Sequence, residues 1–287
     1  MTNVSDNIIS AALPPLVILT GPTAVGKTAL SVELAKAVDG EIISADSMQV
    51  YRRMDIGSAK VTKEEMGGVP HHLIDVLEPE EDFNVVLFQK LAKEAIADIL
   101  SRGKLPILVG GTGFYIQSVL YDIDFTQTKE DSEYRKELER LAVEKGAHYL
   151  HSLLEAADPE AAQQIHENNI KRVIRALEYN AQTGGKISAH NEEQRNNEAA
   201  YRFQYFVLTD EREKLYERID RRVDIMLESG LVDEVRALRD EGLKKGMVSM
   251  QGLGYKEILS YLDGEYDLER AAYLIKRDTR HFAKRQL

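Results

Sequence analysis

The chain has 287 residues, of which 43% are hydrophobic and 30% are charged, a balance typical of a globular protein with one large or two smaller domains. It contains no cysteine, which excludes disulfide bonds, thiolate zinc sites and a cysteine nucleophile. The N-terminus has neither the basic region of a signal peptide nor a long apolar run, so we expect a soluble cytoplasmic protein with no membrane partner.

The formal net charge is -11, which by itself disfavours nucleic acid as a partner because phosphate contacts require Lys and Arg. The basic residues are clustered, however, at 171–175, 212–222 and 276–285. An acidic protein can carry a local basic groove, so the net charge does not exclude RNA.

Strand-like and helix-like segments alternate along the first part of the chain. Short apolar runs at 16–20, 41–46 and 105–109 predict buried strands, and the segments 27–38 and 88–100 have helical spacing. This alternation predicts an α/β fold in which helices flank a parallel sheet. Ligands of such sheets bind beyond the carboxyl ends of the strands.

A polar, helical stretch then interrupts this pattern. Residues 126–200 predict a helical insertion, and the apolar run at 203–208 returns the chain to the sheet. Three helical segments follow, at roughly 211–229, 231–241 and 267–285. We therefore expect an α/β core with C-terminal helices, formed by residues 1–125 and 201–287, and a separate insertion domain at 126–200.

A complete P-loop pattern, G-x-x-x-x-G-K-[ST], follows the first predicted strand and opens the first predicted helix. It consists of Gly21, Pro22, Thr23, Ala24, Val25, Gly26, Lys27 and Thr28. Backbone N–H groups of such a loop bind anionic oxygens, Lys27 adds a positive charge, and Thr28 offers a hydroxyl to Mg²⁺. The alternative is a chance glycine turn. The motif predicts a diphosphate or triphosphate ligand without identifying it as ATP.

Two further strand ends carry candidate functional residues. The strand at 105–109 ends in the sequence GGTG, residues 110–113, where a P-loop NTPase normally has an acidic residue that orders Mg²⁺. GGTG predicts either a second phosphate-binding turn or an ordinary strand-to-helix turn. Asp46 ends the strand at 41–46, where it would serve equally well as a general base or as a helix cap.

Arg222 lies in a predicted helix whose apolar stripe contains Leu215, Ile219 and Met226. It follows Leu215 by seven residues and precedes Met226 by four, so we expect it to face the core with that stripe. A guanidinium in that position requires an anion. The anion is either a structural carboxylate or a bound diphosphate.

Two helical segments present basic residues away from their apolar sides. In the last helix these are Arg277, Arg280 and Lys284, and in the insertion they are Lys171, Arg172 and Arg175. Such a stripe suits an RNA backbone. A solvated helix face explains the same pattern.

The chain as a whole resembles the tRNA dimethylallyltransferases, also called isopentenyl-diphosphate:tRNA transferases. The resemblance rests on the segments GPTAVGKT, ISADSMQVYRRMDIGSAK, GVPHHLIDVLEP, ILVGGTGFY, IHENNIKRVIRALE, RIDRRVDIMLESGLVDEV, QGLGYKEI and TRHFAKRQ. These run from Gly21 to Gln286, nearly the whole chain, and DSMQVYR with GGTG and the Arg222 helix is a highly specific combination. The family is similar to P-loop kinases in fold, which implies a P-loop NTPase-like core with a helical insertion domain.

The resemblance implies a role for each matching residue. Asp46 engages the exocyclic amine of the target adenine, Thr112 lies where diphosphate meets adenosine, and Arg222 clamps the diphosphate opposite Lys27. Contacts with tRNA are implied for Asp46, Ser47, Met48, Gln49, Thr112, Arg135, Lys171, Arg172, Arg175, Gln251, Arg277, Arg280 and Lys284. The expected catalytic residues are Asp46, Thr112 and Arg222.

The implied reaction transfers the dimethylallyl group of dimethylallyl diphosphate to the adenosine immediately 3′ of the anticodon of tRNA. We expect Mg²⁺ as the cofactor, the tRNA anticodon stem-loop as the partner, and a monomer. The alternatives are a P-loop small-molecule kinase, a prenyltransferase of free adenine nucleotides, and a non-catalytic RNA-binding module. The last of these leaves the P-loop unexplained.

Overall fold

The computed structural model describes residues 13–125 and 132–286. Its contacts divide the chain into two compact units: Tyr121–Glu198 form one, and the parts of the chain before and after them together form the other. Residues 1–12, 126–131 and 287 belong to the predicted domain ranges but lie outside the described residues. Each helix of the described part is too short or too polar to cross a membrane.

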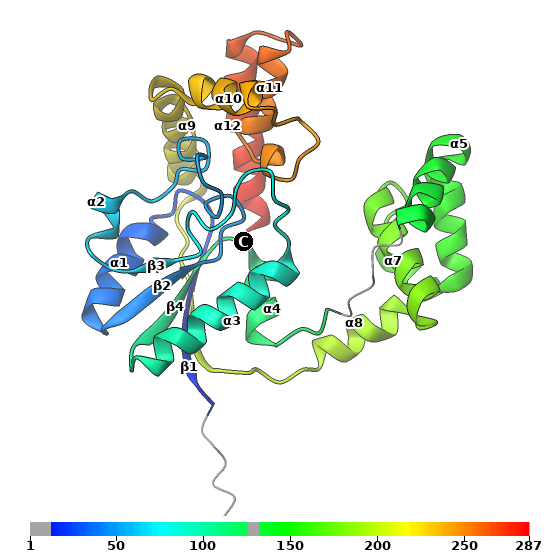
Figure 1. Cartoon of the computed structure of the whole chain (residues 1–287), viewed down its shortest axis with the longest axis horizontal. Coiled ribbons are helices and arrows are strands. Elements are labelled where there is room, and N and C mark those ends of the chain that lie inside the picture. The colour runs from blue at the N-terminus through cyan, green and yellow to red at the C-terminus, as the bar shows by residue number, and fades with distance from the viewer. Residues whose placement is uncertain (1–12, 126–131, 287) are drawn as a thin grey trace, which may run out of the picture. The chain divides into compact units, whose positions relative to one another are not determined.

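Five parallel strands form the sheet of the larger unit in the described chain (Figure 1). In chain order they are β1 (Pro15–Thr20), β2 (Gly40–Ser44), β3 (His71–His72), β4 (Leu105–Gly110) and β5 (Arg202–Val207). Their order across the sheet is β3-β2-β4-β1-β5, so β2, β4 and β1 are neighbours at its centre. The predicted parallel α/β sheet is confirmed. Strand β3 was not predicted, because its two residues are too few for a periodic signal.

Helices cover both faces of this sheet. The chain moves from β1 through α1 (Lys27–Ala37) to β2 in one direction, and from β3 through α3 (Val85–Ser101) to β4 in the other. Because parallel crossovers are right-handed, the two helices must pack on opposite faces. α4 (Gly113–Leu120) packs beside α3, and the short α2 (Lys63–Met66) packs on α1.

The centre of the sheet is buried and mainly apolar, and the buried Glu41 carboxylate of β2 is paired with Arg102. All five residues of β2 are buried, and Ile18 of β1 with Ile107 and Leu108 of β4 have no exposed surface. A fully buried side chain of this size stabilises a protein by about 1.5–3 kcal/mol. Burial on both faces explains why these strands read as largely apolar runs rather than alternating ones.

Four helices follow β5: α9 (Arg212–Glu228), α10 (Leu231–Asp240), α11 (Tyr255–Leu262) and α12 (Leu268–Arg285). α9 packs on α12, α10 packs on α11, and α11 packs on α12. The sequence analysis did not predict α11. Its eight residues offer only two turns of periodicity, and the glycine-rich segment before it disguises its start, yet Tyr255, Ile258 and Leu259 are buried.

The unit Tyr121–Glu198 contains the helices α5 (Ser132–Ala157), α6 (Pro159–Gln164), α7 (Ile170–Thr183) and α8 (Ile187–Arg195). Leu150 and Leu154 of α5 pack against Val173 and Leu177 of α7 in a separate hydrophobic core. Its own core is what makes this segment a compact unit.

The carboxyl ends of the three central strands meet at one edge of the sheet. The P-loop follows β1, Asp46 follows β2 after one intervening residue, and the GGTG turn follows β4. A backbone hydrogen bond of 2.7 Å from the Ala45 N–H to the Val109 carbonyl holds the last two ends together. The parallel topology therefore brings together three motifs that are far apart in the sequence.

Substitution of Gly110 would show how tightly these strand ends are packed. A Cβ atom at this position would lie 2.2 Å from the Ala45 carbonyl oxygen, a backbone atom that cannot turn aside. We expect Gly110→Ala to lower the free energy of unfolding by about 1–3 kcal/mol, the usual cost of overpacking. Gly246→Ala is the matched control, because no atom lies within 4 Å of its added Cβ and its φ is not positive. Thermal or urea unfolding of both variants measures the difference, and equal stabilities would contradict the prediction.

Candidate active site

The P-loop adopts a conformation that needs its glycines. Gly21 has φ of 141° and Gly26 has φ of 98°, and an added Cβ on Gly21 would lie 2.4 Å from the Leu208 carbonyl oxygen. Ala24 is also in the left-handed region, with φ of 63°. The loop leads directly into α1, which begins at Lys27. This is the strand–loop–helix context in which such loops bind phosphate.

The Lys27 ammonium lies against the loop itself. Its Nζ donates hydrogen bonds of 2.9 Å to the carbonyl oxygens of both Gly21 and Pro22. Burial lowers the pKa of Lys27 to about 8, the Asp46 carboxylate opposes that effect, and the Arg222 guanidinium adds to it. Lys27 is therefore a cation held under unfavourable conditions, which an additional anion would relieve.

Asp46 already uses one of its carboxylate oxygens. Oδ1 accepts hydrogen bonds from the backbone N–H groups of Met48, at 2.8 Å, and Gln49, at 3.2 Å. This cap fixes the turn that begins the segment 46–60. In the described chain, hydrogen bonds reach Oδ1 and leave Oδ2 available. Asp46 therefore caps a turn and not the helix that the alternative interpretation required, whereas its role as general base stays a prediction.

A single pocket joins these groups. Its polar lining is formed by Lys27, Thr28, Ser31, Ser44, Asp46, Gln49 and His71. Its other lining residues are Ile42, Val61, Ile74, Val109 and Gly110. The P-loop and Asp46 thus face one space that is polar at one side and apolar at another. Such a pocket can accept a ligand with an anionic end and a short hydrocarbon end.

The lining residues to which the sequence analysis assigned no role include Val61, His71 and Ile74. Two of them lie in the segment GVPHHLIDVLEP, at β3 and just beyond it. No chemical motif marks this segment. Its position beside the P-loop follows from the pairing of β3 with β2, which brings His71 opposite Ile42.

Arg222 does not face the core as predicted. Leu215, Ile219 and Val223 form the buried stripe of α9, Met226 is only partly buried, and Arg222 is exposed. The expected stripe was therefore centred wrongly. The buried face is centred on Ile219, because α9 packs there against Ala283 of α12 and against the P-loop. Arg222 consequently lies at the border of that face.

Arg222 nevertheless belongs electrostatically to the site. Partial removal from water lowers the pKa of Arg222, and the carboxylates of Glu65 and Asp46 act in the opposite direction. Within residues 13–125 and 132–286, no carboxylate forms an ion pair with it. The structural ion pair considered for this residue is thus not found there, and its charge remains available to a ligand.

The GGTG turn connects β4 to α4 beside the P-loop. The Gln286 side chain bridges the two loops: its Oε1 accepts a hydrogen bond of 2.9 Å from the Thr23 N–H, and its Nε2 donates one of 3.1 Å to the Gly111 carbonyl. The Thr112 carbonyl accepts the N–H groups of Tyr115 and Ile116 and so starts α4. Sequence reasoning did not single out Gln286, since a lone glutamine carries no chemical signature.

The residues predicted to contact tRNA differ in their surroundings. On α7, Lys171, Arg172 and Arg175 are exposed. Arg135 instead forms hydrogen bonds of 2.9 and 2.7 Å with the buried Glu178 carboxylate, so its guanidinium stabilises the unit that contains it. Gln251 is exposed and donates to the Lys245 carbonyl.

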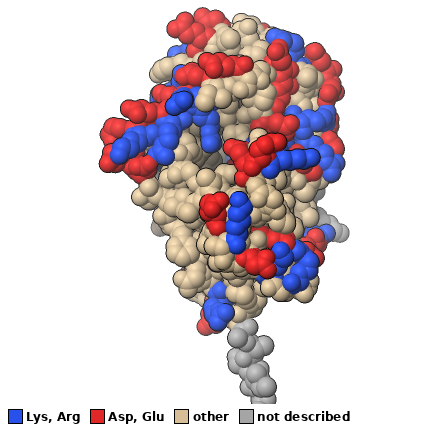
Figure 2. Space-filling view, turned by 90° about the vertical axis from the view of Figure 1, so that its left-hand side faces the viewer, with Lys and Arg blue, Asp and Glu red and all other residues tan. Residues whose placement is uncertain are grey.

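The basic stripe of α12 is partly neutralised. Arg280 donates to both carboxylate oxygens of Asp220 on α9, at 2.5 and 2.8 Å, and Arg277 pairs with Asp278 at 2.7 Å. Lys284 is exposed. Figure 2 likewise shows Lys and Arg interspersed with Asp and Glu on the face it displays. The tRNA roles of these residues stay predictions.

Comparison with known proteins gives concordant results. The model of the family described as IPP transferase matches residues 49–287, and that of the family described as isopentenyl transferase matches residues 14–79. The tRNA dimethylallyltransferase of Lachnoclostridium phytofermentans is 65% identical over 275 residues, which cover 96% of this chain and 88% of the relative.

Solved structures agree with these sequence matches. The full-length tRNA isopentenylpyrophosphate transferase of Bacillus halodurans is 50% identical, with a TM-score of 0.71, over 95% of this chain and 85% of the other. A eukaryotic dimethylallyltransferase acting on tRNA is 32% identical, with a TM-score of 0.83, over 95% of this chain and 69% of the other. With its P-loop, its strand-end carboxylate and matches over almost its whole length, the chain belongs to the IPP transferase family.

Proposed function

We propose that this protein transfers a dimethylallyl group from dimethylallyl diphosphate to the exocyclic amine of the adenosine immediately 3′ of the anticodon in tRNA. The observation that carries the proposal is the shared pocket: the phosphate-binding Lys27 and Thr28 line it together with Asp46 and a set of apolar side chains. The names of the relatives, tRNA dimethylallyltransferase among them, support the same substrate classes.

The donor would place its diphosphate on the P-loop, residues 21–28, and its hydrocarbon among the apolar lining residues. The loop N–H groups and the start of α1 favour negative charge, and Lys27 and Arg222 supply two cations. These two cations repel each other across the site, which contributes to the lowered pKa of Lys27. A diphosphate between them would turn that repulsion into attraction at both cations.

Transfer itself requires one bond to break and one to form. The bond between C1 of the dimethylallyl group and the diphosphate oxygen breaks, its electron pair leaves with the diphosphate, and C1 gains allylic cation character. The adenine amine nitrogen then bonds to C1 and loses a proton to Oδ2 of Asp46. Because charge develops on the diphosphate, Lys27, Arg222 and the loop N–H groups stabilise the transition state more than the ground state.

A magnesium ion fits the donor set of this site. The Thr28 hydroxyl borders the pocket, and Asp46 lines the same pocket. Mg²⁺ is commonly held by one or two protein oxygens, with phosphate oxygens and water completing its coordination. Thr28 would hold the ion together with the diphosphate, where it would neutralise negative charge. In the described chain no cluster of three or more carboxylate or histidine ligands exists, so the protein would contribute few of the ligands.

The acceptor adenosine would enter from the side of Asp46, Ser47, Met48 and Gln49, with Thr112 between it and the diphosphate. A base that is stacked in an anticodon loop must leave the stack to reach such a pocket. Lys171, Arg172, Arg175 and Lys284 are exposed and can hold the tRNA backbone. The guanidinium groups of Arg135, Arg277 and Arg280 are paired with carboxylates, so they would bind tRNA only if each contacts a phosphate in addition to its carboxylate partner. We propose that the protein acts as a monomer.

Supplying labelled donors identifies the reaction. We expect label from dimethylallyl diphosphate to enter tRNA and not AMP, and we expect no phosphorylated product from ATP. Asp46→Asn should reduce this transfer by about 10²–10⁴-fold, because it removes the proton acceptor. Donor binding should change little. Transfer of phosphate from ATP would favour the kinase, label in AMP would favour the nucleotide prenyltransferase, and wild-type turnover in Asp46→Asn would leave Asp46 as a turn cap only.

Donor binding should depend on the protonation of Lys27. In the ligand-free protein Lys27 has a pKa of about 8, and only its ammonium form pairs with diphosphate. Affinity should therefore be highest below that pH and fall up to about tenfold per pH unit above it, until the raised pKa of the complex is reached. Measuring Kd for dimethylallyl diphosphate between pH 6.5 and 9.5 tests this. Lys27→Arg, which stays charged, should lack the decline near pH 8.

Arg222 should affect the reaction and not the fold. We expect Arg222→Gln to reduce turnover by about 10²–10³-fold, the usual cost of losing one group that stabilises transition-state charge. Its thermal stability should match the wild type, because the side chain is exposed and makes no ion pair within the described residues. Arg221→Gln is the matched control, as Arg221 is its exposed neighbour on the same helix. A marked loss of stability in ligand-free Arg222→Gln would show a structural role instead.

A further inference from the structure

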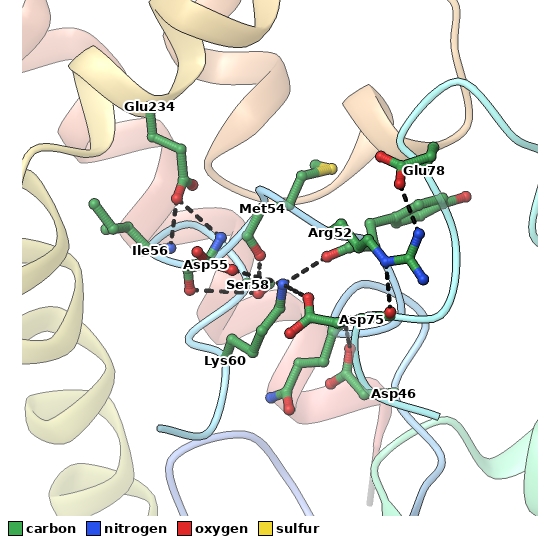
Figure 3. A network of polar contacts seen from close by, with 12 residues as sticks. Asp46, Arg52, Met54, Asp55, Ile56, Ser58, Lys60, Asp75, Glu78 and Glu234 are labelled. Atoms are coloured by element: carbon green, nitrogen blue, oxygen red, sulfur yellow. Dashed lines mark hydrogen bonds and ion pairs between the residues drawn. The ribbon is translucent and has the colours of Figure 1, made fainter. Parts of the chain in front are cut away.

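A carboxylate from α10 receives four hydrogen bonds that no catalytic role explains. Oε2 of Glu234 accepts the backbone N–H groups of Asp55, at 2.9 Å, and Ile56, at 2.8 Å. Oε1 accepts the N–H of Gly57, at 3.0 Å, and the hydroxyl of Tyr255, at 2.8 Å. Figure 3 shows Glu234 reaching from its helix to this loop. Three consecutive N–H groups converging on one anion form a nest, which the carboxylate fixes in place.

The loop that Glu234 holds has a strained backbone. Arg53 has φ of 63° and Ala59 has φ of 48°, both in the left-handed region that non-glycine residues rarely adopt. Between them the chain turns back sharply: the Ala59 N–H donates to the Ile56 carbonyl at 3.0 Å, and the Lys60 N–H donates to the Asp55 carbonyl at 2.9 Å. Such conformations persist only where surrounding contacts enforce them.

This loop in turn supports the turn that carries Asp46. The Gln49 side chain donates to the Ala59 carbonyl at 3.2 Å, and the Lys60 ammonium donates to the Tyr51 carbonyl at 2.6 Å. Lys60 also pairs with Asp55 and Asp75, and its side chain is only 6% exposed (Figure 3). Gln49 is one of the two residues whose N–H groups orient the Asp46 carboxylate. Hydrogen bonds therefore lead from Glu234 through residues 55–60 to Asp46.

Packing leaves this loop little room to move. A Cβ on Gly57 would lie 2.5 Å from the ring of Tyr255, which is completely buried, and a Cβ on Gly252 would lie 2.5 Å from Cε of Met48. The loop thus rests directly on the segment 252–255. Removing the Glu234 carboxylate would leave the three N–H groups unpaired in a place where a small shift is enough to move the turn at 46–49.

We propose that Glu234 is a positioning residue for the acceptor nucleoside: it fixes residues 55–57 and, through Gln49 and Lys60, the orientation of Asp46. The inference rests on the proposed function, which gives the turn at 46–49 its contact with the target adenosine. Binding of the prenyl donor should not depend on Glu234, since the described P-loop makes no hydrogen bond with Glu234.

Glu234→Gln tests the proposal, because the amide keeps the size of the side chain but offers only one acceptor oxygen. With tRNA as the acceptor, we expect kcat/KM to fall about 10- to 100-fold, the effect of misplacing a reacting group by a fraction of an ångström to an ångström. The Kd for dimethylallyl diphosphate should stay at the wild-type value. Tyr255→Phe, which loses one of the four hydrogen bonds and keeps the ring against Gly57, should show a smaller loss of kcat/KM.

Asp233→Asn is the matched control, since Asp233 precedes Glu234 on α10, is exposed, and pairs with Arg236 rather than with the loop. Its kinetics should equal those of the wild type. A Glu234→Gln protein that folds but loses thermal stability and donor affinity together would show a general structural role for Glu234, and the proposal would be wrong. If it does not fold at all, Tyr255→Phe provides the same comparison of donor affinity with tRNA turnover.

A double-mutant cycle shows whether Glu234 acts through Asp46. In an Asp46→Asn background, Glu234→Gln should cost much less than it does in the wild type, because the group that it orients is already disabled. Additive losses would overturn the inference. Full activity of Asp46→Asn alone would instead refute the proposed role of Asp46, whereas a damaged Asp46→Asn with a wild-type-like Glu234→Gln would refute only the role of Glu234.

Discussion

Parallel pairing of β1, β4 and β2 is the constraint on which the site depends. It brings the ends of three strands to one edge of the sheet, and with them the P-loop, Asp46 and the GGTG turn. The hydrogen bond from the Ala45 N–H to the Val109 carbonyl joins two of these ends, and the close approach of Gly110 to the Ala45 carbonyl leaves no room for a side chain between them. Later parts of the chain contact the loops at this edge: α9 packs on the P-loop, and Gln286 joins the P-loop to GGTG.

The two cations at this edge, Lys27 and Arg222, are only partly balanced by the Asp46 carboxylate. Lys27 and Asp46 line the same pocket, the Arg222 guanidinium acts on Lys27 through its charge, and burial keeps the pKa of Lys27 low. An unpaired pair of cations costs stability in a folded protein and is retained where a ligand needs it. Some other basic residues are paired within the protein, as Arg135 is with Glu178 and Arg280 with Asp220. The contrast separates cations held for a ligand from cations used by the fold.

The C-terminal helices contribute to both sides of the proposed reaction. α9 packs on the P-loop through Leu215 and Ile219 and so carries Arg222 to the donor side. α10 and α11 hold the segment 46–60 through Glu234 and Tyr255, on the acceptor side. The end of α12 places Gln286 between the P-loop and GGTG. A substitution in these helices can therefore alter catalysis without touching a substrate.

The sequence by itself determined what depends on neighbouring residues. The P-loop is a contiguous turn, the central strands are continuous apolar runs, and the carboxyl ends of parallel strands gather ligand-binding groups, so Gly21 to Thr28, Asp46 and Thr112 could be placed together in advance. Only the tertiary structure decided the features that depend on contacts between residues far apart in the chain. Helical periodicity could not show which face of α9 meets α12, so the orientation of Arg222 was predicted wrongly. Glu234 binds a loop 177 to 179 residues earlier in the chain, and no local pattern distinguishes it from a solvated glutamate.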